Sequence, residues 1–249
     1  MTISSVGPGV KAQFAEQGYL HVPSLGVPAA ELEQARTLLD GLFDDFAALP
    51  QQFAHDLGGN PDRTQPILPE INAVSTLVPA LRRTALFRAA QDLARTILGP
   101  NAYLLYDHAI YKSPGKQGTT SWHQDSGYDT EHETRLAIWI PFQDTASIDG
   151  AMRYVPGSHL GGRREHLSRV ASDGKSVEYL EVADGEWVDV PCVFGGATLH
   201  DFHTVHGSGP NLGNQVRKAW ILDFGVGSLV ERSVWAAKEK VRARRYAVR

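Results

Sequence analysis

The sequence contains a single cysteine, Cys192, so the chain cannot form an internal disulfide. Proteins of reducing compartments use cysteine in this way, and we therefore expect a cytoplasmic protein. Residues 1–9 lack the basic start and the apolar run of a secretory signal. No later segment is long and apolar enough to cross a bilayer, and the sequence predicts no association with a membrane.

An excess of positive charge is also absent. The chain carries 24 Lys and Arg residues against 28 Asp and Glu residues, a formal net charge of −4. This balance offers no general basic surface to a nucleic-acid backbone, and we expect no nucleic-acid partner. A basic cluster at residues 231–244 is too short to change that conclusion, and we expect a solvated, partly helical tail there.

The length and the hydrophobic content predict a single globular domain. A chain of 249 residues can bury a sizeable core, and 42% hydrophobic with 21% charged residues is typical of globular proteins. We expect one domain over residues 1–249, present as a monomer or homodimer, whose partner is a small-molecule substrate.

The order of the sequence patterns places helices before strands. A short helix is predicted at residues 10–17, and apolar residues then recur at steps of three and four from Leu32 to Leu49 and within residues 79–98. The polar region 50–69 is expected to be an irregular loop that is functional or mobile. After Pro100 the chain changes to short aromatic and aliphatic segments typical of strands. The main predicted strands are residues 103–112, 136–142, 152–155, 187–190, 197–202 and 216–224.

These patterns together predict a mainly β fold with flanking N-terminal α-helices. The β core is expected at roughly residues 100–226, the helical flank at roughly 10–99 and the tail at roughly 227–249.

The stretch from Trp122 to Tyr128 carries the first candidate metal ligands. His123 and Asp125 stand two residues apart, and in an extended segment they point to the same side. A third candidate, His206, lies far downstream, and Arg217 stands eleven residues beyond it. Two histidines and one carboxylate form the open facial site that suits Fe(II). Taken alone, a histidine and an aspartate at this spacing also arise by chance in structural positions.

His206 is preferred over the neighbouring His200 and His203 because a tight turn comes directly after it. Residues 207–211 form this turn, and the chain then returns as the strand that carries Arg217. The planar fork of a buried arginine matches a carboxylate with two parallel hydrogen bonds. The alternative for Arg217 is a surface arginine paired with an acid.

Five segments in this order and spacing resemble the phytanoyl-CoA dioxygenase family. They are residues 112–115, 120–125, 139–141, 153–159 and 206–211, the last with Arg217 behind it. The resemblance covers roughly residues 71–226, with little to match before residue 70 or at 163–183. It implies an Fe(II)- and 2-oxoglutarate-dependent oxygenase on a double-stranded β-helix, the jelly-roll or cupin-like fold.

The resemblance also implies roles for particular residues. His123, Asp125 and His206 would hold Fe(II), and Arg217 would grip the distal carboxylate of 2-oxoglutarate. The residues expected to line the cosubstrate pocket beside Arg217 are Ser208, Trp139 and Lys112. Related halogenases have a small residue in place of the carboxylate, so Asp125 favours the oxygenating branch. Residues 195–203 depart from the family pattern, and His200 and His203 are interpreted as core residues, partners of the ligands or substrate contacts.

The resemblance implies oxidation of an unactivated C–H bond with O2, giving succinate and CO2 from 2-oxoglutarate. The candidate substrate-lining residues are Tyr106, His108, Tyr128 and Arg153. Their mixed aromatic and polar character favours a small-to-medium, partly polar metabolite, as in natural-product biosynthesis. An acyl-CoA hydroxylase of the phytanoyl-CoA type is the alternative within the family.

Two further classes use similar ligands. A cupin-like metal protein without oxygen chemistry would share the two histidines and the carboxylate but would not need Arg217. A zinc hydrolase also accepts this ligand set, yet the sequence offers no obvious general base beside it.

Overall fold

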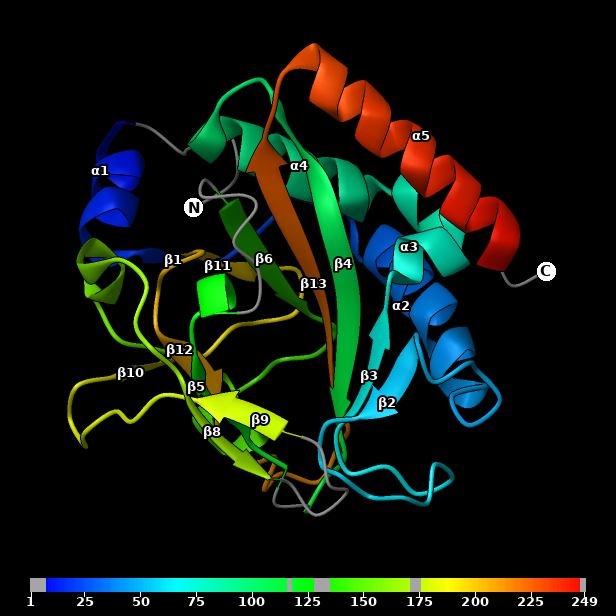
Figure 1. Ribbon diagram of the computed structural model, residues 1–249, viewed down its shortest axis with the longest axis horizontal. Helices are drawn as coiled ribbons and strands as arrows, with labels where there is room; N and C mark the ends of the chain where they lie inside the picture. Colours follow the sequence, from blue (N-terminus) through cyan, green and yellow to red (C-terminus); the bar gives the residue numbers. More distant parts are fainter. Residues whose placement is uncertain (1–7, 116–117, 128–134, 171–175, 247–249) are drawn as a thin grey trace.

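The computed structural model describes residues 8–115, 118–127, 135–170 and 176–246. A large antiparallel sheet has the strand order β1-β11-β6-β13-β4-β3-β2, and a smaller one has the order β10-β7-β12-β5 (Figure 1). Strands β8 and β9 form a separate hairpin. The strand bounds are β1 Tyr19–Val22, β2 Ala54–Asp56, β3 Pro69–Asn72, β4 Ala102–Lys112, β5 Thr120–His123, β6 Arg135–Pro141, β7 Met152–Tyr154, β8 Leu167–Val170, β9 Ser176–Tyr179, β10 Val188–Val190, β11 Ala197–Asp201, β12 His206–Ser208 and β13 Arg217–Val226.

The helices cover the outer face of the large sheet (Figure 1). Helix α4 contacts strands β4, β6 and β13, and the apolar stripe predicted from Leu32 onwards is buried along α2. Helix α4 begins where the Thr84 hydroxyl accepts a hydrogen bond from the backbone N–H of Phe87 at 3.2 Å, an N-terminal cap. The helix bounds are α1 Pro8–Gln17, α2 Ala29–Asp44, α3 Val74–Leu77, α4 Ala85–Leu98 and α5 Leu229–Tyr246.

Alternation along β13 divides the interior into two apolar clusters. Trp220, Leu222 and Phe224 face the helices, whereas Ala219 and Ile221 lie between the two sheets. The smaller sheet contributes residues of β7 and β10 to this inner cluster. The expected mainly β fold, a double-stranded β-helix with a helical flank, is confirmed. That the whole chain, residues 1–249, forms a single domain stays a prediction.

Two local expectations differ from the structure. The region 50–69 is not wholly irregular, because β2 lies in it and pairs with β3. The helical region 79–98 is divided at Thr84 into a short 3-10 helix, Pro79–Arg83, and α4. Strands β8 and β9, which were not among the main predicted strands, pair with each other. The pattern missed β2, β8 and β9 but found the equally short β7 and β10, because strands of three or four residues are too short to give a reliable period.

The loop after β2 is ordered by one carboxylate. Asp56 accepts hydrogen bonds from the backbone N–H groups of Gly58 at 3.0 Å, Ile67 at 3.0 Å and Leu68 at 2.7 Å. These bonds hold both ends of the loop to β2, so a polar segment without periodicity still has a defined path.

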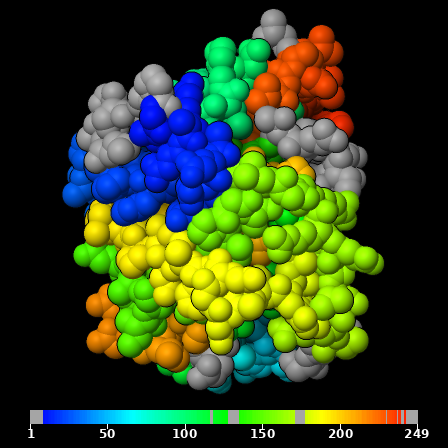
Figure 2. All heavy atoms as spheres, turned by 90° about the vertical axis from the view of Figure 1, so that its left-hand side faces the viewer, coloured from blue at the N-terminus to red at the C-terminus, as the bar shows by residue number. Residues whose placement is uncertain are grey.

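The side of the molecule that carries β7, β8, β9 and β10 faces the viewer in Figure 2. Its yellow-green and yellow surface lies below the blue N-terminal segment that contains α1. Helix α5 contacts α3 on the other side of the molecule (Figure 1). Among the described residues, no helix has the length and apolar character needed to span a membrane.

Candidate active site

His123, Asp125 and His206 converge at one end of the smaller sheet. Strands β5 and β12 pair so that His123 and His206 lie opposite each other. Asp125 Oδ1 is 3.7 Å from His123 Nε2 and 3.6 Å from His206 Nε2. One candidate ligand atom from each residue lies within 4.8 Å of the others. The structure therefore brings together the three residues predicted to hold a metal.

Asp125 reaches this cluster by a different route from the one expected. Strand β5 ends at His123, and Asp125 begins a 3-10 turn, Asp125–Gly127, instead of continuing the strand. Gln124, fully buried, fixes the turn, because its side-chain amide donates to the His203 carbonyl at 2.5 Å. Its carbonyl oxygen accepts from the Arg164 backbone N–H at 2.7 Å. The anchored turn, and not strand alternation, aims the carboxylate.

Hydrogen bonds orient both histidine rings toward the carboxylate. Nδ1 of His123 is 2.8 Å from the Ser121 carbonyl, and Nδ1 of His206 is 2.9 Å from the Thr204 carbonyl. A carbonyl can only accept, so each Nδ1 carries the proton and each Nε2 is the unprotonated nitrogen. This is the tautomer that binds a metal through Nε2.

The charge states also suit a divalent cation. Burial lowers the pKa of His123 and lowers the pKa of His206 well below its usual value, so both rings are neutral. Burial alone would raise the pKa of Asp125, but the neighbouring His206, His200 and His123 hold it below its ordinary range. Two neutral imidazoles and one carboxylate are the deprotonated donors that Fe(II) requires, and the residues present fit that ion.

Arg217 lies buried on the inner face of the large sheet. Its Nη1 donates to the Gly150 carbonyl at 3.1 Å, and its guanidinium carbon is 5.4 Å from the centroid of the Trp139 ring. Its Nε, also buried, has no hydrogen-bond partner among the described residues. Burial lowers the pKa of Arg217 to about 9, which leaves it protonated at neutral pH. A buried cation with an unused donor needs an anionic partner.

Lys112 lies next to Arg217, paired with it across β4 and β13. Its ammonium donates to the Ser208 hydroxyl at 2.8 Å and to the Gly209 carbonyl at 2.7 Å. Burial first, and the charges of Arg217 and Arg153 after it, lower the pKa of Lys112 well below its ordinary value. The structure thus brings together the four residues predicted to line a cosubstrate pocket, Lys112, Trp139, Ser208 and Arg217. That they bind a cosubstrate stays a prediction.

The candidate substrate-lining residues divide into three groups. His108 and Tyr106 lie on the inner face, where the Tyr106 hydroxyl bonds the side chain of Asn72. Arg153 donates to Asp189 at 2.9 Å and stacks on Trp187 at 4.3 Å. It alternates along β7 with Met152 and Tyr154, which belong to the inner cluster, so it faces outward. Tyr128 lies outside the described residues.

Sequence reasoning missed two acidic residues that face the same interior. Glu70 on β3 is 2.5 Å from His108 Nδ1 through one oxygen and 2.6 Å from His55 Nε2 through the other. Asp223 on β13 pairs with Arg135 at 3.4 Å, and burial raises its pKa to about 6. Asp223 stands six residues after Arg217 on β13, so strand alternation places both side chains on the same face, and the sequence did offer this signal. Glu70 gave none, because β3 is too short to show a period.

We expect Glu70→Gln to remove an acid-dependent part of the stability. Burial opposes ionisation, but bonds from His108 and His55 outweigh it and lower the pKa of Glu70 to about 2, below the ordinary range of a glutamate. Its stabilising contribution is therefore complete above the unfolded pKa and is lost as pH falls through the folded one. Near neutral pH we expect the variant to be less stable by roughly 1–3 kcal/mol, because the charge is lost and the glutamine carbonyl oxygen can accept from only one of the two histidines.

Urea unfolding of the two proteins from about pH 6 to about pH 3 measures this difference. The gap between wild type and Glu70→Gln is expected to narrow toward the acid end. Glu181→Gln, at an exposed carboxylate, is the control, and its free energy of unfolding is expected to equal that of wild type at every pH. If the difference in the free energy of unfolding between wild type and Glu70→Gln is the same at all pH values in this range, the lowered pKa of Glu70 is contradicted.

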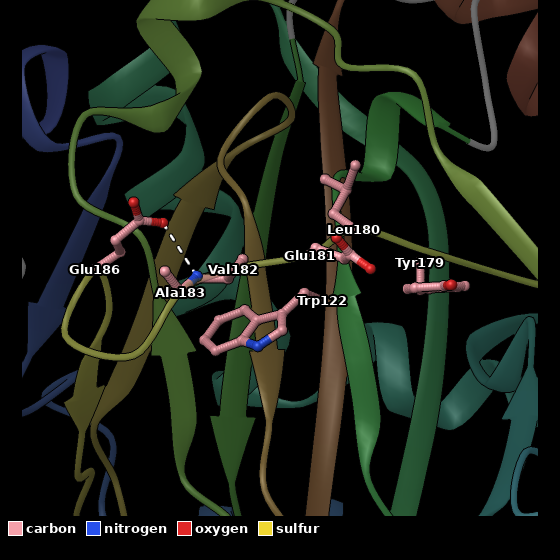
Figure 3. Close-up of a pocket in the computed structure, with 7 residues that line it drawn as sticks. All are labelled: Trp122, Tyr179, Leu180, Glu181, Val182, Ala183 and Glu186. Carbon is pink, nitrogen blue, oxygen red and sulfur yellow. Dashed lines mark hydrogen bonds between the residues drawn. The ribbon is translucent and has the colours of Figure 1, made fainter.

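A separate hollow of about 670 Å³ lies outside the barrel (Figure 3). Trp122 lines it, and because Trp122 and His123 alternate along β5, the indole and the imidazole point to opposite sides. Glu186 on its rim accepts a hydrogen bond from the backbone N–H of Ala183 (Figure 3). The hollow is thus distinct from the His123, Asp125 and His206 cluster.

Solved structures with this fold identify the class. EvdO2 from Micromonospora carbonacea var. aurantiaca has a TM-score of 0.74 and 28% identity, over 90% of this chain and 92% of that one. A structure of EvdO2 complexed with 2-oxoglutarate has a TM-score of 0.73 and 27% identity, over the same shares of both chains. The β-helix and the cluster of two histidines and a carboxylate are those of the non-haem, 2-oxoglutarate-dependent oxygenases.

Sequence relatives narrow the class to a family. The family model of phytanoyl-CoA dioxygenase matches residues 14–219, and the chain belongs to this family. A probable alpha-ketoglutarate-dependent hypophosphite dioxygenase of Stutzerimonas stutzeri is 32% identical over 139 residues, 53% of this chain and 47% of the relative. Ectoine dioxygenase of Halomonas elongata is 29% identical over 235 residues, 83% of this chain and 67% of the relative. The chain spans about half the length of the first curated relatives it matches.

Proposed function

We propose that this protein is an Fe(II)- and 2-oxoglutarate-dependent oxygenase that oxidises an unactivated C–H bond of a small-to-medium polar metabolite. Succinate and CO2 are the coproducts, and the reaction belongs to natural-product biosynthesis. One observation carries the proposal. Two neutral histidines and a carboxylate form a donor set in the same interior as Arg217, a buried arginine that lacks an anionic partner in the described part of the chain. When bound, iron and 2-oxoglutarate supply the oxygen activation that no side chain provides.

In this proposal, the chain holds the cosubstrate by its distal carboxylate. Arg217 offers its unused Nε and its planar fork, and Lys112 places a second positive charge beside it. Two neighbouring buried cations repel each other unless an anion joins them, which favours a carboxylate at this position. Ser208 lies two residues after His206 on β12, so one short strand links the ligand histidine to the carboxylate end.

Apolar side chains of the inner cluster lie beside the buried cations. Trp139, Ile110 and Ile221 belong to the inner cluster between the sheets. They keep water from the buried cations and strengthen the attraction between those cations and an anion.

The inner wall of the barrel favours a polar substrate over a long acyl chain. His108, Glu70, Asp223 and Arg135 are charged or hydrogen-bonding groups, and each is paired within the wall. A hydrocarbon tail against such a wall would remove water from these charged groups without offering them a hydrogen bond in return. The relatives named for ectoine and hypophosphite are named for small polar compounds, which agrees with this inference.

Anaerobic absorption spectroscopy tests the class before any substrate is known. Fe(II) and 2-oxoglutarate added together are expected to give the weak visible band of their chelate, and admission of O2 should then yield succinate. A metal that binds without the band would indicate a cupin-like protein, and selective binding of zinc would indicate a hydrolase. Tight binding of a coenzyme A ester in a thermal-shift screen would favour the acyl-CoA alternative.

A further inference from the structure

We infer that His200 is a positioning residue for Asp125, which holds one carboxylate oxygen so that only the other can bind a metal. The inference rests on the proposed function, because it takes His123, Asp125 and His206 as the metal ligands. It assigns a role to a histidine that the sequence left open between core, partner of a ligand and substrate contact.

The two oxygens of Asp125 have different neighbours. Nε2 of His200, on β11, is 3.1 Å from Oδ2. Oδ1 is the oxygen that faces the ligand histidines, at 3.7 Å from His123 Nε2 and 3.6 Å from His206 Nε2. A carboxylate ion can only accept, so His200 donates its Nε2 proton to Oδ2. This bond leaves Oδ1 free for the metal.

The His200 ring makes its hydrogen bond to Asp125 and to nothing else among the described residues. Its other nitrogen, Nδ1, is buried without a partner. The ligand histidines differ, because each gives its Nδ1 proton to a backbone carbonyl and presents Nε2 to the carboxylate. A proton on Nε2 of His200 also explains why Nδ1 can be buried without a partner. In this tautomer Nδ1 carries a lone pair and no N–H group that needs an acceptor.

Packing fixes the ring in this orientation. Its centroid lies 4.0 Å from that of His206 and 5.4 Å from that of Tyr154. The Tyr154 hydroxyl is bound to the Thr198 hydroxyl at 2.8 Å, so this neighbour is itself held. Because the His200 ring is held rigidly, its N–H keeps the Asp125 carboxylate in one orientation. Residues that hydrogen-bond to metal ligands commonly have this effect.

The expected effect is that Asp125 binds through one oxygen. Two histidines and a carboxylate that each supply one ligand atom would leave the other positions of a bound metal open. A carboxylate that is free to turn can bind through both oxygens and close one of those positions. His200 would therefore preserve the room that a two-point chelator such as 2-oxoglutarate needs.

His200→Leu and His200→Gln test the inference, with His203→Leu as the matched control. Leucine removes the donor, whereas the glutamine side-chain amide can still donate to Oδ2. His203 lies three residues further along the same segment, but its ring is 3.6 Å from Asp201 and its side chain is 26% exposed. Three quantities are measured anaerobically: Fe(II) affinity, the visible band of the Fe(II) and 2-oxoglutarate chelate, and thermal unfolding without metal.

His200→Leu is expected to weaken Fe(II) binding by roughly 10–100-fold and to shift or remove the band. His200→Gln is expected to stay within about threefold of wild type, and His203→Leu to match it. If His200→Leu does not fold without metal, the glutamine variant and its band position carry the test.

Two outcomes overturn the inference. Wild-type affinity with an unchanged band in His200→Leu would make the ring a packing residue. A folded His200→Gln that binds as weakly as the leucine variant would mean that the ring itself contacts the metal. Failure of the proposed function looks different, because wild type would then bind no Fe(II), or Asp125→Ala would bind it unchanged.

Discussion

Asp125→Ala is expected to weaken Fe(II) binding by on the order of 100-fold or more. The variant keeps the two imidazoles, which burial holds neutral, but loses the anionic member of the cluster. A divalent ion would then lie in a buried site with no compensating charge, which is unfavourable. The loss of Fe(II) affinity should exceed the loss caused by replacing a residue that only holds a ligand in place, such as His200. Asp125→Ala removes the ligand atom itself.

Thermal unfolding with and without Fe(II) under anaerobic conditions measures this loss. In wild type, metal at a hundredfold excess over the wild-type Kd should raise stability by about 2.7 kcal/mol, and in the variant the same metal concentration should raise it by about 0.4 kcal/mol or less. Asp189→Ala is the control, because that carboxylate pairs with Arg153 on the outward face of β7 and β10. A metal-induced shift that survives in Asp125→Ala would mean that the ion binds elsewhere.

The residues that sequence alone could bring together are those on long, regular strands. Lys112, Arg217 and Trp139 lie on β4, β13 and β6, where alternation fixes which side chains face inward. The order of the family segments then connected these strands to His123 and His206. The choice of these residues rests on the resemblance to the family, and alternation along the long strands agrees with it.

The contacts that sequence could not predict depend on closure of the barrel. Glu70 and His108 are separated by 38 residues, and Asp125 and His200 by 75. Neither pair has a local pattern, since β3 is short and Asp125 lies in a turn instead of a strand. The role of such a side chain depends on a partner that is distant in the sequence, so the residues next to it in the chain do not reveal that role.

Arg217→Ala is expected to weaken 2-oxoglutarate binding by roughly 100-fold, because two charge-assisted hydrogen bonds to its distal carboxylate are lost. Arg217→Lys should recover only part of the affinity, since lysine supplies the charge without the planar fork and without the stack on Trp139. Titration of the anaerobic visible chelate band with 2-oxoglutarate gives both dissociation constants. Fe(II) affinity without 2-oxoglutarate should stay unchanged in both variants, because Arg217 is not part of the metal cluster.

A second ligand identifies which end of the cosubstrate Arg217 holds. The compound 2-oxopentanoate has the same keto-acid end as 2-oxoglutarate but lacks the distal carboxylate, so its affinity should be equal in wild type and Arg217→Ala. Arg169→Ala, at an exposed arginine near the Tyr179 ring, is the control for a general loss of positive charge. Equal weakening of both ligands in Arg217→Ala would place the arginine at the keto-acid end, and no weakening of either would remove it from the cosubstrate site. A selective loss of 2-oxoglutarate would assign the buried, unused Nε of Arg217 to the distal carboxylate.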